Sequence, residues 1–571
     1  MSSASIPAFT SFRAASGGYG ARGIDLFCTV SAVEGYRALS RSAGCHTART
    51  VRAVRALGSG IGALGSNRGQ PPDAWSTAYG TLTLTALGQP IPAGWINFLT
   101  SLAGHDGGFA MSPGNAAEIW ASGLALQALA QAGALNDVDL HSVARWFASC
   151  QTPAGGLTWS PDAAGQTSGD VRATAFALTA LQSASAMRLF ASEADVDLLA
   201  HWLRSLQDNS GGFRLDEHHR PCLWGTGEAL AALQVLGARP HNPRSCRRFV
   251  EEHIDLQAGG FVRATMFPQR SDVWANRQGI RSLGLLGASV PGQLADSVTA
   301  FLDRCALSAG GYTYRPVEDA PDALTTAAAV LAGDNSPSTL DVLAASVMPD
   351  EGGYAYMPAR GAEARATQWT VTALRASGRA FDVGGLARWA GRMQNPDGGF
   401  GAWIGRGSDD TSTCAVVHTV GGQLQIGLDF AALRHRTAVR LADVLAGATT
   451  DVVKLSVLCR TAVALSMSID GHRVMHILDA HGIDGGWRRS ERSAPDLATT
   501  YAVLLAHQAL GRLGDRVAAA ARWTNRLARG EDGVAWSALA RVPAGPVPSA
   551  LASLISATAE DPCCQLPDLC L

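Results

Sequence analysis

The sequence lacks the features that would place the protein in a membrane or on nucleic acid. Its apolar stretches, such as residues 323–332, stay well below the ~18–20 residues of a membrane-spanning helix. Residues 1–12 show no basic segment followed by an apolar core, so we expect no secretory signal peptide. The net charge is −2 with both signs mixed along the chain, which provides no basic surface. We expect a cytoplasmic protein without a nucleic-acid partner; peripheral membrane contact and the oligomeric state stay open.

Disulfide spacing and strand patterns are missing as well. The eleven cysteines follow no framework, so we expect free thiols. Cys563, Cys564 and Cys570 lie in a Pro-containing tail, which is either an incidental flexible end or a metal- or redox-sensitive one. Only Leu571 follows Cys570, so we expect no C-terminal lipidation box. Alternating Val, Ile and Thr runs do not occur, so the sequence predicts an all-α chain.

One pattern is instead repeated along the chain. A Gly-Gly turn followed by an aromatic residue or Leu precedes a loop, an acidic residue and, four positions later, a small polar residue that opens an Ala/Leu-rich helix. Clear copies pair Gly398–Phe400 with Asp409, and Gly310–Tyr312 with Asp322. A period of roughly 45–50 residues is typical of stacked supersecondary units. The acidic position recurs at Asp25, Asp73, Glu118, Asp170, Asp272, Asp322, Glu363, Asp409 and Asp496, with Cys222 and Asp451 in weaker copies.

Each copy predicts two helices joined by a glycine-rich turn. The acidic residue suits a helix N-cap, where it accepts hydrogen bonds from free N–H groups, so we interpret most of these residues as structural. About twelve helix pairs can be counted, and 571 residues exceed one ordinary core. Pairs of a small inner and a longer outer helix close into rings. The sequence therefore predicts two α/α toroids (α6-α6 barrels).

The turn also carries a preceding glutamine, as in Gln151–Gly156, Gln207–Gly212 and Gln394–Gly399. This phrase resembles the QW repeat of the squalene cyclase and protein prenyltransferase superfamily, and the resemblance extends from about Gly17 to Trp536. Two toroids in one chain resemble the βγ arrangement of class II terpene cyclases, including the bacterial squalene–hopene cyclases. That resemblance implies a β-type barrel of residues 1–44 and 290–571 carrying the chemistry, and a γ-type barrel of residues 45–289.

Class II cyclases begin by protonating an alkene or epoxide, which requires a carboxyl kept protonated in an apolar cavity. The family motif is Asp-x-Asp-Asp-Thr, and its middle Asp is the donor. In this chain the donor would stand two residues after the repeated acidic residue, a place we call the +2 position. No +2 position carries an acid: they hold Phe27, Trp75, Trp120, Arg172, Trp224, Trp274, Leu324, Arg365, Thr411, Val453 and Ala498.

A relocated acid is the remaining way to supply the proton. Residues 407–411, Gly-Ser-Asp-Asp-Thr, match the end of the motif. Two adjacent carboxylates can share a proton, which raises one pKa, so Asp409 and Asp410 are candidate acids. Asp319 and Asp322 are further candidates. The alternative interpretation is that Asp409 caps a helix and Asp410 is a first-turn acid.

A carbocation also needs aromatic faces. Trp75, Trp120, Trp224 and Trp274 share the +2 position and would cluster if that position faces the toroid axis; otherwise they are packing residues. The candidate substrate-binding aromatic residues of the C-terminal half are Tyr314, Tyr354, Tyr356, Trp369, Phe400, Trp403 and Trp487.

A diphosphate substrate would need a cationic clamp. The candidates are Arg488, Arg489 and Arg492. We expect no metal site formed by the protein, and Mg²⁺ would enter only with a prenyl diphosphate.

The sequence thus predicts a noncanonical class II-type terpene cyclase, an isomerase or lyase of terpenoid biosynthesis, acting on an isoprenoid or polyene in an apolar barrel cavity. Two alternatives stay open. A diverged toroid that only binds an isoprenoid or other hydrophobic ligand would explain the missing donor. A protein prenyltransferase β-subunit would place Asp410, Cys414 and His418 around zinc, but the outer two lie ~12 Å apart along an ideal helix.

Overall fold

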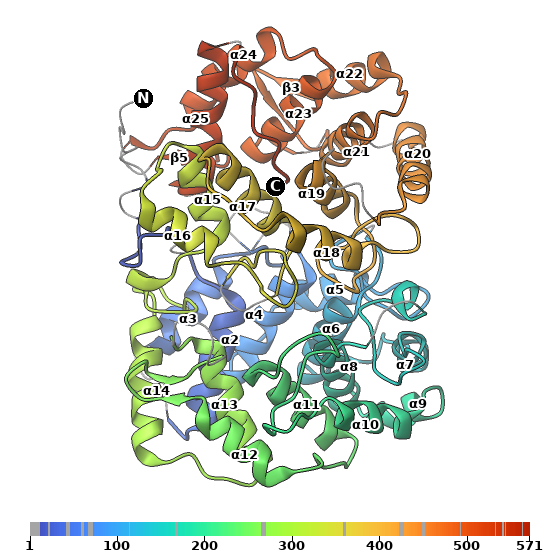
Figure 1. The fold of residues 1–571 in the computed structure, drawn as a ribbon, viewed down its shortest axis with the longest axis vertical. Helices are drawn as coiled ribbons and strands as arrows, with labels where there is room; N and C mark the ends of the chain where they lie inside the picture. The colour runs from blue at the N-terminus through green and yellow to red at the C-terminus, as the bar shows by residue number, and fades with distance from the viewer. Residues whose placement is uncertain are drawn as a thin grey trace. The chain divides into compact units, whose positions relative to one another are not determined.

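The computed structural model of the protein describes most of the chain. The described residues are 9, 12–20, 23–41, 46–58, 62–66, 72–113, 115–165, 169–263, 270–357, 361–421, 427–447, 451–491, 493–530, 533–539, 542, 544–561 and 563–571. They form 24 α-helices (Figure 1) and three short two-stranded ribbons. Among them, no helix combines the length and the apolar character that crossing a membrane requires. The predicted all-α fold is confirmed.

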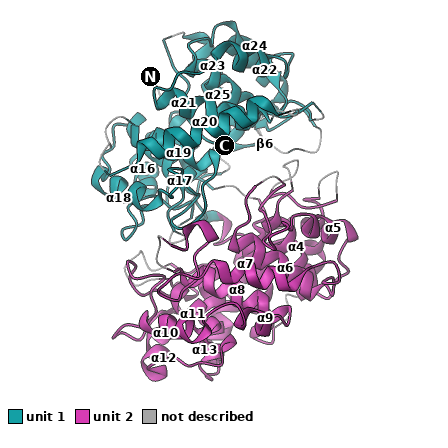
Figure 2. Ribbon diagram, turned by 90° about the vertical axis from the view of Figure 1, so that its right-hand side faces the viewer, with its two compact units in different colours: residues 1–21, 318–571 teal, residues 22–317 magenta. Residues whose placement is uncertain are grey.

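The chain forms two compact units, coloured separately in Figure 2. Unit 1 consists of residues 1–21 and 318–571, and unit 2 consists of residues 22–317. These limits differ from the expected limits at 44/45 and 289/290.

Unit 2 is an α/α toroid. Its six inner helices each contact the next, and the last contacts the first, which closes the ring. The inner helices are almost wholly buried: in α6, ten residues between Ile119 and Leu129 are buried. The inner helices are α2 (Leu26–Ala38), α4 (Ala74–Ala86), α6 (Ile119–Gln131), α8 (Val171–Ser183), α11 (Leu223–Val235) and α13 (Val273–Leu285).

The outer helices of unit 2 are amphipathic. In α12, for example, only Cys246, Phe249 and Val250 are buried, because one face packs on the inner ring and the other meets solvent. The outer helices are α3 (His46–Arg55), α5 (Ala93–Ser101), α7 (Leu140–Ser149), α9 (Met187–Ala191), α10 (Val196–Ser205), α12 (Pro243–Glu252) and α14 (Gly292–Cys305).

Unit 1 is a second closed toroid of six inner helices, with α25 contacting both α23 and α15. Its inner helices are α15 (Ala323–Leu331), α17 (Ala364–Ala376), α19 (Asp410–Val420), α21 (Val452–Ala464), α23 (Leu497–Ala509) and α25 (Pro546–Glu560). Its described outer helices are α16 (Pro337–Ala344), α18 (Val383–Met393), α20 (Phe430–Ala446), α22 (Gly471–Asp479) and α24 (Asp515–Thr524).

The remaining elements are short. The 3₁₀ helices are η1 (Pro161–Ala163), η2 (Val317–Asp319) and η4 (Asn525–Leu527). Three antiparallel ribbons pair β1 (Ile254–Asp255) with β2 (Gly260–Phe261), β3 (Gly482–Ile483) with β4 (Gly486–Trp487), and β5 (Val534–Ala535) with β6 (Ala544–Gly545).

The repeated acidic residues cap the inner helices. Asp25, Asp73, Glu118, Asp170, Asp272, Asp322, Asp409, Asp451 and Asp496 accept hydrogen bonds from first-turn N–H groups. Cys222 does the same with its sulfur, which accepts from Gly225 N at 3.3 Å. Glu363 is an exception, since it makes no side-chain cap hydrogen bond and pairs with Arg365 instead. The cap interpretation of the repeat is confirmed for the other copies.

The repeat also ties each turn to an inner helix. The N–H after the Gly-Gly pair donates to the small polar side chain of the repeat, as from Leu157 to Thr174 at 3.0 Å. Each toroid closes by this bond. Tyr312 donates to Thr29 at 3.0 Å, and Tyr19 donates to Thr326 at 2.9 Å. The expected pairing of Gly310–Tyr312 with Asp322 was therefore wrong, because ring closure joins segments far apart in the sequence.

Candidate functional site

The axis of unit 2 is lined with aromatic residues at the +2 position, so the predicted clustering of Trp75, Trp120, Trp224 and Trp274 occurs. Trp75 and Trp120 have ring centroids 4.3 Å apart, and those of Trp224 and Trp274 are 3.8 Å apart. Phe27 contacts Trp274 at 5.2 Å. We call this set, together with Tyr79, Trp159 and Phe176, the aromatic cluster. Rings from α2, α4, α6, α8, α11 and α13 all take part.

Two arginines lie over faces of this cluster. Arg172 lies 4.9 Å from the centroid of Trp224, and Arg263 lies 4.5 Å from that of Trp274. Each guanidinium is also paired with a cap carboxylate, Arg172 with Asp170 at 2.6 Å and Arg263 with Asp272 at 2.6 Å. The faces of Trp224 and Trp274 are therefore each in contact with a buried, positively charged guanidinium group.

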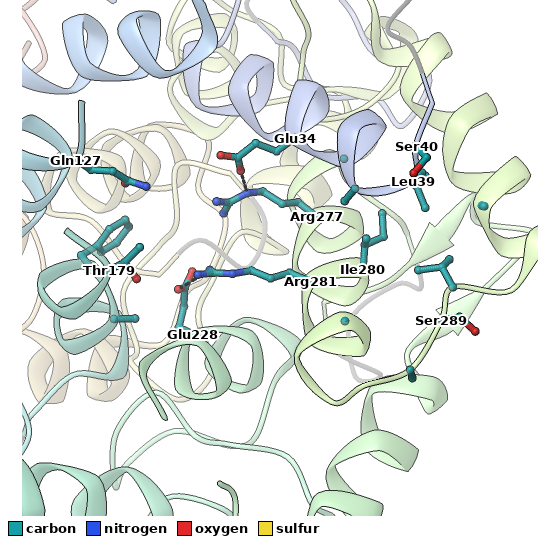
Figure 3. A pocket seen from close by; sticks show the side chains of 18 residues that line it. Glu34, Leu39, Ser40, Gln127, Thr179, Glu228, Arg277, Ile280, Arg281 and Ser289 are labelled. Carbon is teal, nitrogen blue, oxygen red and sulfur yellow. Dashed lines mark hydrogen bonds and ion pairs between the residues drawn. The ribbon is translucent and has the colours of Figure 1, made fainter. Parts of the chain in front are cut away.

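A cavity of about 680 Å³ lies within unit 2. Phe176 of α8 belongs both to its lining and to the aromatic cluster, because it stacks on Trp120 at 5.3 Å. The volume falls within the range of roughly 300–1,000 Å³ that small-molecule sites occupy. Figure 3 shows Glu34, Arg277, Arg281 and Glu228 directed toward one another across this cavity.

The charges in the cavity are balanced. Arg277 on α13 pairs with Glu34 on α2, and Arg281, one turn later, pairs with Glu228 on α11 at 3.4 Å. Gln278 donates a further hydrogen bond to Glu228. Besides these two ion pairs, the lining mixes apolar residues such as Phe176 and Ile280 with polar ones such as Gln127 and Thr179. Because both guanidinium groups are already paired with carboxylates, a ligand with a hydrocarbon body and an uncharged polar end would match this lining.

The axis of unit 1 is occupied by the C-terminal tail, residues 563–571. Leu566, Leu569 and Cys570 are buried there. Gln508 of α23 binds both backbone groups of Leu566, and Tyr501 donates to the Pro567 carbonyl at 2.8 Å. The inner helices of unit 1 therefore hold an extended polypeptide through its backbone.

Gln368 and Trp369 of α17 bind the end of the tail. Gln368 accepts from Cys570 N at 2.8 Å and donates to the Asp568 carbonyl at 3.0 Å. Trp369 donates to the Cys570 carbonyl at 2.8 Å. Figure 1 accordingly marks the C-terminus close to α17 and α19.

A buried ion pair fixes the same segment. Arg460 of α21 is 1% exposed and pairs with the Asp568 carboxylate. It also donates to the Leu569 carbonyl at 3.3 Å. A buried guanidinium without an anion would be strongly destabilising, so the polar lining of this axis suits the tail and does not suit a hydrocarbon.

The candidate acids Asp409 and Asp410 both lie at the start of α19. Asp409 caps the helix by accepting from Ser412 N and Ser412 Oγ, each at 2.7 Å. Asp410 pairs with Arg436 at 3.1 Å and Arg440 at 3.0 Å on outer helix α20. The two carboxylates are thus engaged separately, one with its own helix and one with the outer layer.

The other predicted acids are also placed by structural contacts. Asp322 is buried and accepts from Thr325 N at 2.7 Å as the cap of α15. Asp319 lies in the 3₁₀ helix η2.

Two cap carboxyls that the sequence analysis did not single out as acids have shifted pKa values. Burial raises the pKa of Asp73, although hydrogen bonds from Ser76 oppose the shift. Burial likewise raises the pKa of Asp496. Asp73 comes two residues before Trp75 of the aromatic cluster. In the sequence, Asp73 and Asp496 stand out only as copies of the repeated acidic residue, and that pattern gives no information about burial.

The predicted substrate-binding aromatic residues of the C-terminal half are divided between the two units. Tyr314 belongs to unit 2, and Arg315 lies 5.5 Å from its centroid. Phe400 and Tyr354 are buried in the core of unit 1, where burial raises the pKa of Tyr354 to about 12. Arg406 lies 4.5 Å from the centroid of Trp403.

The remaining aromatic candidates also have separate positions. Trp369 binds the tail. Tyr356 is partly buried, and its carbonyl accepts from Ala323 N at 2.9 Å. Trp487 packs in the core of unit 1.

Two of the three arginines of the predicted cationic clamp make contacts within the protein, and the clamp itself stays a prediction. Arg489 pairs with Asp451 at 2.7 Å. Arg488 donates to the Glu491 carbonyl at 3.0 Å. Arg492 lies outside the described residues.

The sequence model of the prenyltransferase alpha-alpha toroid domain matches residues 74–261, 175–333 and 269–433. Together the matches span more than half of the chain. The protein belongs to this family. The family assignment confirms the predicted toroid fold. A search of curated proteins finds no match.

Solved structures of related fold include terpene cyclases and a prenyltransferase. ent-Copalyl diphosphate synthase from Streptomyces platensis is 15% identical over 94% of this chain and 95% of its own, with a TM-score of 0.45. Type II terpene cyclase MstE from Scytonema is 15% identical over 50% of this chain and 96% of its own, with a TM-score of 0.34. Candida albicans protein geranylgeranyltransferase-I is 14% identical over 52% of this chain and 88% of its own, with a TM-score of 0.32.

The prenyltransferase alternative placed Asp410, Cys414 and His418 around zinc. In the structure, Asp410 has different partners from Cys414 and His418. Asp410 turns to the arginines of α20. Cys414 and His418 instead meet Asp568 of the tail. Asp568 and Arg460 were not predicted from the sequence, because helix periodicity gives no signal that a distant, irregular tail enters the toroid.

Proposed function

We propose that this protein is a noncanonical class II-type terpene cyclase that folds an isoprenoid or polyene substrate in unit 2. The observation that carries the proposal is the aromatic cluster, which joins a cavity of about 680 Å³ through Phe176. Aromatic faces stabilise the carbocations that move along a polyene during cyclisation.

Asp73, our candidate acid, caps α4 at the edge of the sequence segment that carries Trp75 and does not itself line the cavity. A proton donor for an alkene must be a carboxyl whose protonated form is favoured by an apolar setting. Burial raises the pKa of Asp73, and Trp75 follows two residues later. In this proposal the donor is the cap residue itself, shifted by two positions from the family's donor.

Asp409 and Asp410 form the rival donor site. The ion pairs of Asp410 with Arg436 and Arg440 offset its charge and favour a structural role. The tail also occupies the axis of unit 1. A reaction there would require the tail to leave.

A toroid that binds a hydrophobic ligand without turnover is the second candidate. It is favoured by the capping role of every described acid of the repeat except Glu363. The cavity would then hold an isoprenoid or another apolar molecule, with Arg277 and Arg281 facing its polar end.

Product analysis separates these possibilities. Purified protein is incubated with squalene, oxidosqualene and geranyl, farnesyl and geranylgeranyl diphosphates, with and without Mg²⁺, and the products are identified by gas chromatography and mass spectrometry. A cyclic product that falls at least about 100-fold in Asp73→Asn supports the proposal. Asp496→Asn is the matched control, since it is also a cap with a burial-raised pKa but lies in unit 1.

Two other results redirect the assignment. A product lost in Asp409→Asn/Asp410→Asn but kept in Asp73→Asn would move the donor to unit 1. Folded protein that turns over none of these substrates, while an isoprenoid quenches its tryptophan fluorescence, would establish the binding toroid instead.

A further inference from the structure

Three side chains of metal-binding type meet where the tail crosses the axis of unit 1. Cys414 and His418 lie one turn apart on α19, and Asp568 comes from the tail. One ligand atom from each residue lies within 4.8 Å of the other two. The group exists because the tail enters the toroid and adds a carboxylate to a Cys-His pair on one helix.

The spacing approaches that of metal ligands. His418 Nδ1 lies 3.2 Å from Asp568 Oδ2. In a tetrahedral zinc site with bonds of about 2.0–2.3 Å, ligand atoms lie roughly 3.3–3.8 Å apart. Small side-chain movements would therefore bring the three atoms around one ion.

The carboxylate is already oriented by buried neighbours. Arg460 holds Asp568 Oδ1, and Gln368 also donates to Oδ1 at 3.4 Å. Oδ2 faces His418. Outer hydrogen bonds of this kind fix the orientation of ligands in metal sites.

The donor set selects a thiophilic ion. Cys414 is fully buried, and a side-chain hydrogen bond connects its thiol with that of Cys570. His418 turns Nδ1 toward Asp568 Oδ2, so Nδ1 is the imidazole nitrogen that would bind the ion. Sulfur and imidazole donors favour zinc and similar ions over Mg²⁺ or Ca²⁺.

We propose that Cys414, His418 and Asp568 bind a divalent metal ion of the zinc class, which fastens the C-terminal tail to α19. The ion would join an inner helix to a segment that otherwise depends on hydrogen bonds and the Arg460 ion pair. Its role is structural. It is independent of the proposed cyclisation, because that reaction is placed in unit 2.

Metal content and tail protection test the site. Wild-type protein purified without chelator should contain about one equivalent of zinc by plasma mass spectrometry. Co²⁺ added to the metal-free protein should give thiolate-to-cobalt charge-transfer absorption. Chelation should increase cleavage of residues 563–571 by a carboxypeptidase.

Variants identify the ligands. Cys414→Ser, His418→Gln and Asp568→Asn should each weaken Zn²⁺ binding at least about tenfold, as measured by competition with a chromophoric chelator. Circular dichroism checks that each variant is folded.

Cys246→Ser is the matched control, because Cys246 is a buried cysteine on α12 of unit 2, and it should bind zinc as the wild type does. Wild-type protein that binds no Zn²⁺ would overturn the proposal. So would unchanged affinity in the folded Cys414 and Asp568 variants, or a Cys414–Cys570 disulfide in place of a metal.

Discussion

The two toroids share one repeat but fill their axes in opposite ways. In unit 2 the +2 position is mostly aromatic, and the rings pack with one another beside a cavity. In unit 1 that position holds Leu324, Arg365, Thr411, Val453 and Ala498, and the axis is filled by the tail. The frame that builds the toroid therefore does not determine what its axis can hold.

The two axes also differ in whether their buried polar groups have hydrogen-bond or ion-pair partners. The rings of the aromatic cluster pack on one another, whereas the indole N–H groups of Trp224 and Trp274 find no hydrogen-bond partner among the described residues. Arg460 and Gln368 are each 1% exposed, and they would lose their partners if the tail left. Unit 1 thus depends on its own C-terminus, whereas unit 2 retains a cavity of about 680 Å³.

The largest effect is expected from removing the buried cation of unit 1. Arg460→Leu leaves Asp568 without its main cationic partner, and breaking such a pair costs about 3–5 kcal/mol. The free energy of unfolding of unit 1 should fall by this amount in urea, and the tail amides should lose hydrogen-exchange protection. Arg379→Leu is the control, since its pair with Asp341 is exposed and is worth at most about 1 kcal/mol. Equal losses in the two variants would contradict the distinction.

The next effect tests the aromatic cluster of unit 2. Trp274 is 2% exposed, so Trp274→Ala should cost about 3 kcal/mol of unfolding free energy through lost contacts and a cavity. Val453→Ala at the matching +2 position of unit 1 should cost about 1 kcal/mol or less. Urea unfolding followed by hydrogen exchange assigns each loss to its unit. Similar losses at the two positions would remove the contrast between the axes.

A smaller effect depends on pH and concerns the polar interior of unit 1. Burial lowers the pKa of His507 to about 4, whereas the unfolded histidine has a pKa near 6.5. The unfolded chain therefore binds more protons between these values, so stability is present above pH 6.5 and is lost as pH falls toward 4. The expected loss is about 2 kcal/mol between pH 6.5 and 5.

The matched variant for this pH dependence is His507→Leu. It removes the titrating group while keeping an apolar volume in α23, so it should flatten this part of the stability profile. A profile of unchanged steepness in the variant would assign the acid sensitivity to other groups.

Much of the fold followed from local chemistry. The caps were predictable because an acidic residue before an Ala/Leu-rich helix satisfies free N–H groups wherever it occurs. The clustering of Trp75 and Trp120 was predictable because equivalent positions of a closed repeat face the same axis. Ring closure by the hydrogen bond between Tyr312 and Thr29 was not predictable, because this bond joins residues far apart in the chain.

The candidate sites were harder to predict for a related reason. The sequence placed Asp409 and Asp410 together, but their partners Ser412 and Arg436 lie on different layers. The tail has no helical period, and its contacts come from four inner helices. Residue spacing therefore identified Cys414 and His418 without their third partner, Asp568.

The smallest effect compares the strength of the caps in the two units. Asp496 accepts from Thr499 N at 2.8 Å and from Thr499 Oγ1 at 2.7 Å, so Asp496→Ala should cost unit 1 about 1 kcal/mol. Cys222 offers α11 only a weak sulfur acceptor at 3.3 Å, so Cys222→Ala should cost unit 2 no more than about 0.5 kcal/mol. Thermal unfolding of both variants measures the difference. A larger loss for Cys222→Ala would mean that the sulfur supports the neighbouring Trp224 by packing, and that the aromatic cluster, rather than the cap, holds the start of α11.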